Sequence, residues 1–150
     1  MESIFSSKGN ESYISRINQL TPETERKWGT MSVSQMLAHL NVTFDMSFTD
    51  RYPKPTGLKK WMLKLLVKGS VVGPKPYKKN LRTAPIFLVK DDKDFDKEKK
   101  KLLAYVHQVH KLGADYFEGR SSHSFGKLTK GEWDNMFSKH LDHHLLQFGV

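Results

Sequence analysis

His140 and His144 stand four residues apart near the C-terminus, the spacing that stacks two side chains on one face of a helix. A helical wheel places them on the centre line of an apolar face that also holds Trp133, Phe137 and Phe148. The residues on the opposite side are expected to face water: Asn135, Lys139 and Asp142. Two buried imidazoles need partners for their ring nitrogens, and a divalent cation would bind one nitrogen of each ring. The pair is equally compatible with hydrogen-bonded histidines in a core.

A third histidine, His39, belongs to another predicted helix. That helix is apolar around much of its circumference, which favours a place in the interior with contacts to two neighbours. His39 lies beside its main apolar stripe and is expected to face the final helix. Three histidines from two helices would form a three-nitrogen site with an open position for water or substrate, as in catalytic zinc sites. Imidazole ligands suit Zn, Ni, Fe or Cu, and the ligand type does not choose among them.

The other histidines rank lower as candidates. His143 points about 80° away from the centre of the buried face. His123 lies in a predicted loop, 121–126, just before the last helix. It could approach the site as a ligand, acid or base, although a capping or solvent-facing role is the simpler interpretation. His107 and His110 flank the last turns of a helix, where a cation interacts well with the helix dipole, and are interpreted as structural.

Apolar periodicity and end signals predict the elements that position these histidines. Four substantial helices are expected, at 7–20, 32–48, 91–113 and 129–148, together with a shorter one at 57–68. Capping boxes mark the starts of two of them: Ser32 with Gln35, and Thr129 with Glu132. Gly113 is a natural helix stop, and 86–89 could be a buried extended run. With almost no period-two pattern, the chain is predicted to be an all-α four-helix bundle, a single domain spanning 1–150.

The chain has 150 residues, 37% of them hydrophobic and 27% charged, an ordinary globular composition that rules out a disordered or low-complexity chain. It contains no cysteine, which excludes disulfide scaffolds, thiolate zinc fingers, iron–sulfur sites and cysteine nucleophiles. The N-terminus lacks the features of a signal peptide, and no apolar run reaches the ~20 residues that a bilayer requires. We therefore expect a cytoplasmic protein.

The net charge of +9 is concentrated in one segment. Residues 51–90 contain 11 of the 25 basic residues and no acidic residue, which leaves 14 basic against 16 acidic residues elsewhere. This basic segment is interpreted as an insertion between the second and third main helices. Its helix at 57–68 has Lys60, Lys64 and Lys68 on one strip and leucines opposite, and such a helix can lie on an anionic membrane. The preferred interpretation is that the apolar face covers the bundle while the lysines are solvated.

The two histidine-bearing stretches resemble motifs of the DinB-like (YfiT-like) metal-binding superfamily. Residues 28–39 (WGTMSVSQMLAH) resemble its second-helix motif, and 140–149 (HLDHHLLQFG) look like its last-helix motif. More narrowly, the chain resembles a bacterial branch, a domain of unknown function, with the pattern HxFGxLT…EW…KHLDHHLxQFG near the C-terminus. Here the pattern begins at His123 and continues into the terminal run. The resemblance covers the chain from Leu20 to Val150.

The resemblance implies a four-helix bundle in which three histidines hold a single metal ion, and the motifs transfer that role to His39, His140 and His144. Gln147 matches a glutamine that follows the last ligand by three residues. The superfamily includes metal-dependent transferases and isomerases that use low-molecular-weight thiols, and its members are often dimers, so a homodimer is an expectation. Members often have proline after the loop histidine where this chain has Ser124. The conformation around the loop histidine is therefore left open.

Two functions are consistent with these observations. The first is a metal-dependent enzyme, a thiol-dependent transferase or a hydrolase acting on a small molecule, with Zn or Ni as favoured metals and a low-molecular-weight thiol as candidate co-substrate. The three histidines would be its ligands, with Gln147 supporting them and His123 as a candidate acid or base. The alternative is a non-catalytic binding module whose basic segment 51–90 contacts an anionic membrane surface or a partner. No groove-reading motif predicts a specific nucleic-acid partner.

Overall fold

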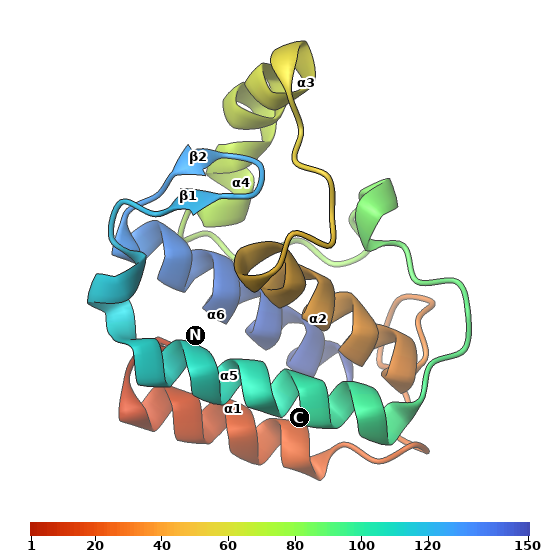
Figure 1. Ribbon diagram of the computed structural model, residues 1–150. Helices are drawn as coiled ribbons and strands as arrows, with labels where there is room; N and C mark the ends of the chain where they lie inside the picture. Colours follow the sequence, from red (N-terminus) through yellow and green to blue (C-terminus); the bar gives the residue numbers. More distant parts are fainter.

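The computed structural model describes residues 1–150, and four helices form the body of the protein (Figure 1). They are α1 (Ser7–Gln19), α2 (Val33–Phe48), α5 (Phe95–Phe117) and α6 (Lys130–Gln147). α5 packs against each of the other three, and α6 also contacts α1 and α2. The apolar faces of these helices enclose the core, and the predicted all-α bundle is confirmed.

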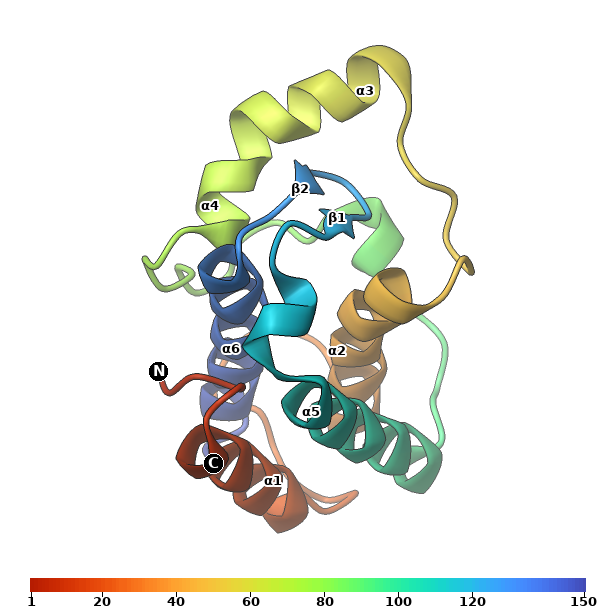
Figure 2. The same ribbon diagram turned by 60° about the vertical axis from the view of Figure 1, so that its left-hand side comes forward.

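The remaining elements are short. α3 (Gly57–Met62), a π-helical turn (Leu63–Val67) and α4 (Lys68–Val72) follow one another without a break, and a 3₁₀ turn (Pro85–Phe87) comes later in the same basic segment. Strands β1 (Ser121–Ser122) and β2 (Gly126–Lys127) pair antiparallel, with Ser121 opposite Lys127. Figure 2 shows this hairpin in the connection between α5 and α6.

The two helices that carry the three candidate ligands, α2 and α6, begin at the predicted capping boxes. The Ser32 hydroxyl accepts from the Gln35 backbone N–H at 3.2 Å, and the Gln35 side chain accepts from the Ser32 N–H at 3.0 Å. Thr129 and Glu132 make the same reciprocal pair at the start of α6. Each box satisfies backbone donors that a helix N-terminus leaves unpaired, so local sequence sets where each of these helices begins.

Gly113 interrupts α5, as its interpretation as a stop signal predicts. Its φ of 75° and ψ of 165° define a conformation that is essentially restricted to glycine. The chain bends there and adds a further helical turn that ends at Phe117. This turn carries the Phe117 ring into the core, where its centroid lies 5.4 Å from that of Trp133 and 5.6 Å from that of Phe137. The bend therefore packs the end of α5 against the first half of α6.

An aromatic layer in the core holds α2 and α6 at a fixed separation. The ring of Phe44 on α2 stacks on that of Phe137 on α6 at 5.0 Å and on that of Tyr105 on α5 at 5.4 Å. Phe137 precedes His140 by three residues, and Phe44 follows His39 by five. Since neighbours on a helix face are three or four residues apart, this layer lies about one turn from the histidines and sets the distance between the two helices that carry them.

The helix predicted at 57–68 is present as α3 and the π-helical turn, but its apolar face does not cover the bundle. Five of its large apolar side chains are exposed: Leu58, Trp61, Met62, Leu65 and Leu66. Figures 1 and 2 show α3 projecting beyond the bundle, whereas α4 lies against α6. The expectation of a covered face is therefore wrong, because only the inward side, with Leu63 and Val67, packs on the core. None of the helices combines the length and apolar character that crossing a membrane would require.

The expectation of a buried extended run at 86–89 is also wrong. These residues start inside the 3₁₀ turn, and Ile86 and Leu88 are exposed to solvent. The basic segment is tied to the bundle elsewhere, because the Lys68 ammonium pairs with the Glu132 carboxylate at 2.8 Å. This ion pair joins the start of α4 to the first turn of α6.

Lys139 is a third departure from expectation, because it is 2% exposed rather than in water. α4 and the loop after it cover this side of α6. The Lys139 ammonium donates to the backbone carbonyls of Ser70 and Gly73 and lies 4.6 Å from the centroid of the Tyr77 ring. Burial lowers the pKa of the ammonium to about 8. A helical wheel correctly places Lys139 opposite the core. It cannot show that Ser70 and Gly73, which lie 69 and 66 residues earlier in the chain, pack over this position.

Candidate metal centre

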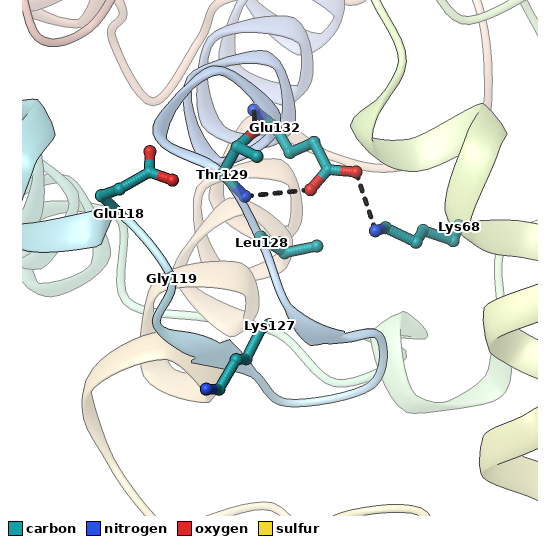
Figure 3. A pocket seen from close by; sticks show the side chains of 7 residues that line it. All are labelled: Lys68, Glu118, Gly119, Lys127, Leu128, Thr129 and Glu132. Carbon is teal, nitrogen blue, oxygen red and sulfur yellow. Dashed lines mark hydrogen bonds and ion pairs between the residues drawn. The ribbon is translucent and has the colours of Figure 1, made fainter.

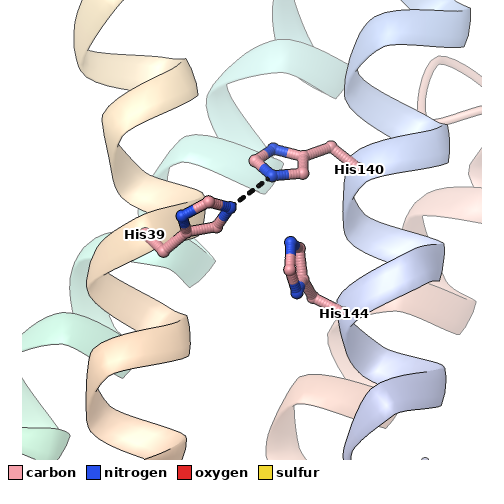
Figure 4. Close-up of side chains that lie close together, drawn as sticks. All are labelled: His39, His140 and His144. Atoms are coloured by element: carbon pink, nitrogen blue, oxygen red, sulfur yellow. Dashed lines mark hydrogen bonds between the residues drawn. The ribbon is translucent and has the colours of Figure 1, made fainter. Parts of the chain in front are cut away.

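Three histidines converge between α2 and α6, as Figure 4 shows. His39 projects from α2, and His140 and His144 project from successive turns of α6. One ring nitrogen of each lies within 4.8 Å of the others, close enough for a single metal ion to bind all three. His39 and His144 are buried and His140 is partly exposed, so the cluster is largely shielded from water.

The Nδ1 atom of each ring is held by a group outside the cluster. His39 Nδ1 lies 3.0 Å from the carbonyl oxygen of Phe87, and His144 Nδ1 lies 2.7 Å from Oε1 of Gln147. His140 Nδ1 lies 2.9 Å from the hydroxyl of Thr43. With every Nδ1 engaged in this way, the nitrogens left to face one another are the Nε2 atoms.

Two of these contacts determine which nitrogen carries the proton. A carbonyl oxygen can only accept, so His39 Nδ1 is the protonated nitrogen and its Nε2 bears a lone pair. The side-chain amide of Gln147 is oriented by the Trp28 carbonyl, to which its Nε2 donates at 2.7 Å. Its Oε1 therefore accepts from His144 Nδ1, and the Nε2 of His144 also bears a lone pair. Two of the three rings are thus held in the tautomer that a metal ligand needs.

The third ring can adopt either tautomer because its partner is a hydroxyl. His140 Nε2 lies 2.8 Å from His39 Nε2, a distance that requires a proton between the two nitrogens. Without a metal, His140 Nε2 donates that proton, and its Nδ1 accepts from Thr43. If a cation took the place of the proton, Nδ1 would carry the hydrogen and donate to the same hydroxyl, since a threonine hydroxyl both donates and accepts. The cluster therefore fits a divalent ion without leaving a polar group unpaired.

The spacing of the nitrogens also fits a metal ion. A zinc–nitrogen distance of about 2.1 Å places the nitrogens of a tetrahedral site about 3.4 Å apart. The observed separations run from 2.8 Å, for the hydrogen-bonded pair, up to a limit of 4.8 Å. This range includes the nitrogen separation of a tetrahedral zinc site.

Burial keeps all three imidazoles neutral near pH 7, which is the form that binds metals. Removal from water lowers the pKa of His39 and lowers that of His140 well below its usual range, and in His140 the neighbouring histidines add to the effect. For His144, burial lowers the pKa to about 3. Protons therefore compete weakly with a metal ion for these nitrogens at neutral pH.

Aromatic side chains wall the cluster. The Phe87 ring lies 5.5 Å from that of His39 and 6.1 Å from that of His140, and the Tyr77 ring stands edge-on to His140 at 6.4 Å, all between centroids. Burial raises the pKa of Tyr77 to about 12, so its phenol is neutral. His143 lies at the margin against Tyr77 and outside the converging group, in keeping with its lower rank.

The other predicted site residues fall in two places. Gln147 lies against His144, as a supporting residue should. His123 lies in the turn between β1 and β2, where its ring nitrogens contact the Ser124 hydroxyl at 2.8 Å and the Tyr52 carbonyl at 3.3 Å. It is not part of the converging group, and its acid–base role stays a prediction.

Sequence reasoning missed two supporting groups, Thr43 and the Phe87 carbonyl. Thr43 follows His39 by four residues on the same helix, so its presence on the same face was available as a signal. No comparable signal marks Phe87, which lies 48 residues from His39 in the chain and contributes only a backbone atom. The basic segment therefore forms part of the site, through Phe87 and Tyr77, and is not merely an insertion beside it.

A separate cavity of about 570 Å³ lies at the start of α6 (Figure 3). Its lining contains no histidine: Lys68, Glu118, Gly119, Lys127, Leu128, Thr129 and Glu132. Glu132 accepts from the Thr129 N–H and pairs with Lys68, so these groups are already engaged in holding the helix start. The chemistry of the protein is better sought at the histidines.

Gly29 is the position where one added methyl group is expected to disturb the metal centre. Its φ of 82° is unfavourable for other residues, and a Cβ there would collide with Nε2 of Gln147. Because Gln147 holds His144, we expect Gly29→Ala to lower zinc affinity about 10- to 100-fold, the usual effect of losing a group that orients a ligand. A competition titration measures this. Gly131→Ala in α6, where a Cβ would meet only the Thr129 hydroxyl at an ordinary contact distance of 4.0 Å, is the control. Equal affinity of both variants would contradict the role of Gln147.

The fold and the site define a class, namely all-α bundle proteins with a three-histidine cluster that could hold a metal ion. Residues 5–149 match the family described as "Protein of unknown function (DUF1569)", and the chain belongs to this family. Comparisons with curated proteins and with solved structures give no significant match. The family description assigns no activity, so the function has to be argued from the site.

Proposed function

We propose that this protein is a metal-dependent enzyme that binds one divalent cation through His39, His140 and His144 and acts on a small molecule. The observation that carries the proposal is the convergence of three neutral imidazoles whose Nδ1 atoms are all held by other groups. Three protein ligands leave a coordination position for water or substrate, whereas structural zinc sites use four. Zn and Ni are the favoured metals.

A bound divalent cation would supply Lewis acidity that lowers the pKa of a thiol or a water molecule. The residues of the chain orient the ligands and exclude solvent. Phe87, Thr43 and Gln147 hold the rings, and the aromatic walls keep water away from one side. The resemblance of the two histidine motifs to the DinB-like superfamily supports a low-molecular-weight thiol as co-substrate, with thiol transfer as the reaction and hydrolysis as the variant in which water is activated.

A cavity that reaches the cluster through Phe87, and that none of the three histidines lines, supports a small-molecule substrate. It has a volume of about 350 Å³ and a mixed polar and apolar lining: Thr30, Met31, Gln35, Thr83, Phe87, Leu88, Val89 and Lys90. Phe87 connects it to the cluster through its carbonyl, and Gln35 lies one helical turn before His39. This size suits a small metabolite, and the basic residues of 51–90 would attract an anionic one. A cytoplasmic location, where such thiols are kept reduced, accords with the proposal.

Elemental analysis and equilibrium titration of the purified protein test the metal site. We expect one Zn²⁺ or Ni²⁺ per chain, either as isolated or after titration of the chelator-treated protein. The exposed His107 provides a matched control, since His107→Ala removes a histidine without touching the cluster. A protein that is isolated without metal and binds neither ion would overturn the proposal.

A conjugation assay tests the reaction separately. The protein is mixed with an electrophilic model substrate and a cysteine-based low-molecular-weight thiol, and thioether formation is followed with the metal-loaded and the metal-stripped protein. Acceleration that disappears on stripping and returns on reloading supports thiol transfer. Metal-dependent hydrolysis of the electrophile without thioether formation would identify water as the nucleophile instead. Equal rates with and without metal would leave the site without a catalytic role.

A further inference from the structure

The outer face of α3 and the π-helical turn is unexplained by the metal centre. Its apolar residues follow the i, i+3, i+4, i+7, i+8 pattern of an amphipathic helix, and together they are called the α3 stripe: Leu58, Trp61, Met62, Leu65 and Leu66. Each is between 46% and 71% exposed. Clustered apolar side chains at this level of exposure mark a surface that binds something.

The charges around the α3 stripe are all of one sign. Lys59, Lys60 and Lys64 are exposed on the same helix and form no ion pair. No acidic residue occurs anywhere from 51 to 90, so no neighbour in the segment offsets their charge. The partner of this surface should therefore present an apolar layer bordered by negative charge.

We propose that the α3 stripe docks on the surface of an anionic lipid bilayer, with the helix lying in the plane of the interface. A lipid surface offers acyl chains to the leucines and anionic headgroups to the lysines in one layer. Trp61 suits the boundary between them, because indole rings concentrate at membrane interfaces. At about 100° per residue, Lys59 lies at one edge of the stripe and Lys64 lies about 60° beyond the other edge. The long side chains of these two lysines can reach the headgroups while the apolar residues enter the interface.

The charge pattern disfavours the other occupants. A second copy docked through the same stripe would bring two sets of unpaired lysines together with no acidic residue in the segment to neutralise them. A nucleic acid would engage the lysines but leave the leucines in water, and the stripe holds one aromatic residue rather than a stacking series. An anionic bilayer satisfies both kinds of side chain.

The stripe is held out from the bundle. The Lys68–Glu132 ion pair and the hydrogen bonds from Lys139 to Ser70 and Gly73 anchor α4 to α6 directly after the exposed helix. α3 continues from this anchor and projects beyond the bundle in both views (Figures 1 and 2). The apolar side chains are therefore presented outward on a fixed support, so docking requires no unfolding of the bundle.

Co-sedimentation with lipid vesicles tests the inference on the full-length protein. We expect the protein to pellet with phosphatidylcholine vesicles that contain about 30% phosphatidylglycerol, and to stay in solution with phosphatidylcholine alone. Trp61 should shift its fluorescence to the blue on binding, and Trp61→Phe should remove that shift without preventing sedimentation. Absence of sedimentation with anionic vesicles would overturn the proposal.

Two pairs of variants separate charge from apolar contact. Lys59→Glu with Lys64→Glu should lower the partition coefficient at least 30-fold, since each lysine near an anionic surface contributes about fivefold. The control, Lys97→Glu with Lys100→Glu, makes the same change in net charge at exposed positions on α5 and should bind as the wild type does.

The apolar pair is Leu65→Ser with Leu66→Ser, which leaves the charge unchanged and should lower partitioning about tenfold or more. Leu146→Ser, at a position 51% exposed on α6, is its control. If the serine pair binds vesicles as tightly as the wild type, the contact is electrostatic only and the interfacial helix is wrong. If the protein does not bind vesicles, and sedimentation equilibrium shows wild-type dimers but monomers of the Leu65→Ser, Leu66→Ser variant, the α3 stripe joins two copies of the chain and the lipid proposal is wrong.

Discussion

Replacing His140 with alanine is expected to lower the affinity for Zn²⁺ on the order of 200-fold or more. Three-coordinate binding shares its free energy among three ligands, and apparent zinc-binding free energies of about 10 kcal/mol or more correspond to at least ~3 kcal/mol for each of them. His140 is the best position for the test, because it contacts His39 directly and its other partner is a hydroxyl that water can replace. A competition titration against a chromogenic chelator measures the change.

Controls distinguish loss of a ligand from loss of the fold. His107→Ala should keep wild-type affinity, and circular dichroism should show that His140→Ala remains helical. Thr43→Val keeps all three imidazoles but removes the hydroxyl that holds His140, so we expect a smaller loss of about 10-fold. If His140→Ala binds zinc as the wild type does, the three histidines are hydrogen-bonded core residues and not ligands.

The second large effect is acid unfolding of the metal-free protein. A histidine in an unfolded chain has a pKa near 6.5, whereas burial lowers that of His144 to about 3 and those of His39 and His140 in the same direction. Between these values the unfolded chain binds more protons than the folded one, so stability is present above pH 6.5 and is lost as the pH falls. A histidine that stays neutral costs about 1.4 kcal/mol per pH unit below 6.5, so His144 alone should cost about 2 kcal/mol of stability by pH 5. His39 and His140 add to this loss in the same direction.

Urea denaturation at pH 7, 6 and 5 measures this loss. The metal-free wild type should lose at least about 2 kcal/mol of its free energy of unfolding over that range. A metal-loaded sample should keep its stability to lower pH, because protons must displace the bound ion before the histidines can be protonated. The His144→Leu variant should be less stable than the wild type at pH 7, because Gln147 loses its partner. Its free energy of unfolding should fall less steeply with decreasing pH, by about 1.4 kcal/mol per pH unit, because one fewer histidine has to stay neutral. A wild-type midpoint that is unchanged from pH 7 to pH 5 would show that the histidines are not neutral in the fold.

Local signals in the sequence account for most of the helical framework. The four main helices were predicted at 7–20, 32–48, 91–113 and 129–148, and each matches an observed helix with ends that differ by at most four residues. Caps, a helix-stop glycine and apolar periodicity act over a few residues, so they can be read without the fold. The pairing of His140 with His144 is of the same kind, because a spacing of four on a helix fixes the shared face.

The surroundings of individual helix faces depended on contacts between segments that are far apart in the sequence. The wheel of α6 could not show that Lys139 lies under α4, and the amphipathic pattern of 57–68 could not show that its apolar face points away from the bundle. An amphipathic pattern indicates that one face of a helix needs an apolar partner, but it does not show whether that partner is the core of the same protein or another molecule. The same pattern would have served a helix packed on the core.

The histidine cluster depends both on local sequence signals and on tertiary contacts. Residue type and helical spacing singled out His39, His140 and His144 as candidate ligands, and the resemblance to a known family added Gln147 as their support. The packing of Phe44 on Phe137 brings α2 and α6 close enough for the nitrogens of the three histidines to meet. The proton positions came from the fold alone, since the carbonyls of Phe87 and Trp28 reach the site from other parts of the chain. Helix formation follows from interactions a few residues long, whereas the direction of each lone pair follows from hydrogen bonds that form only when the whole chain has packed.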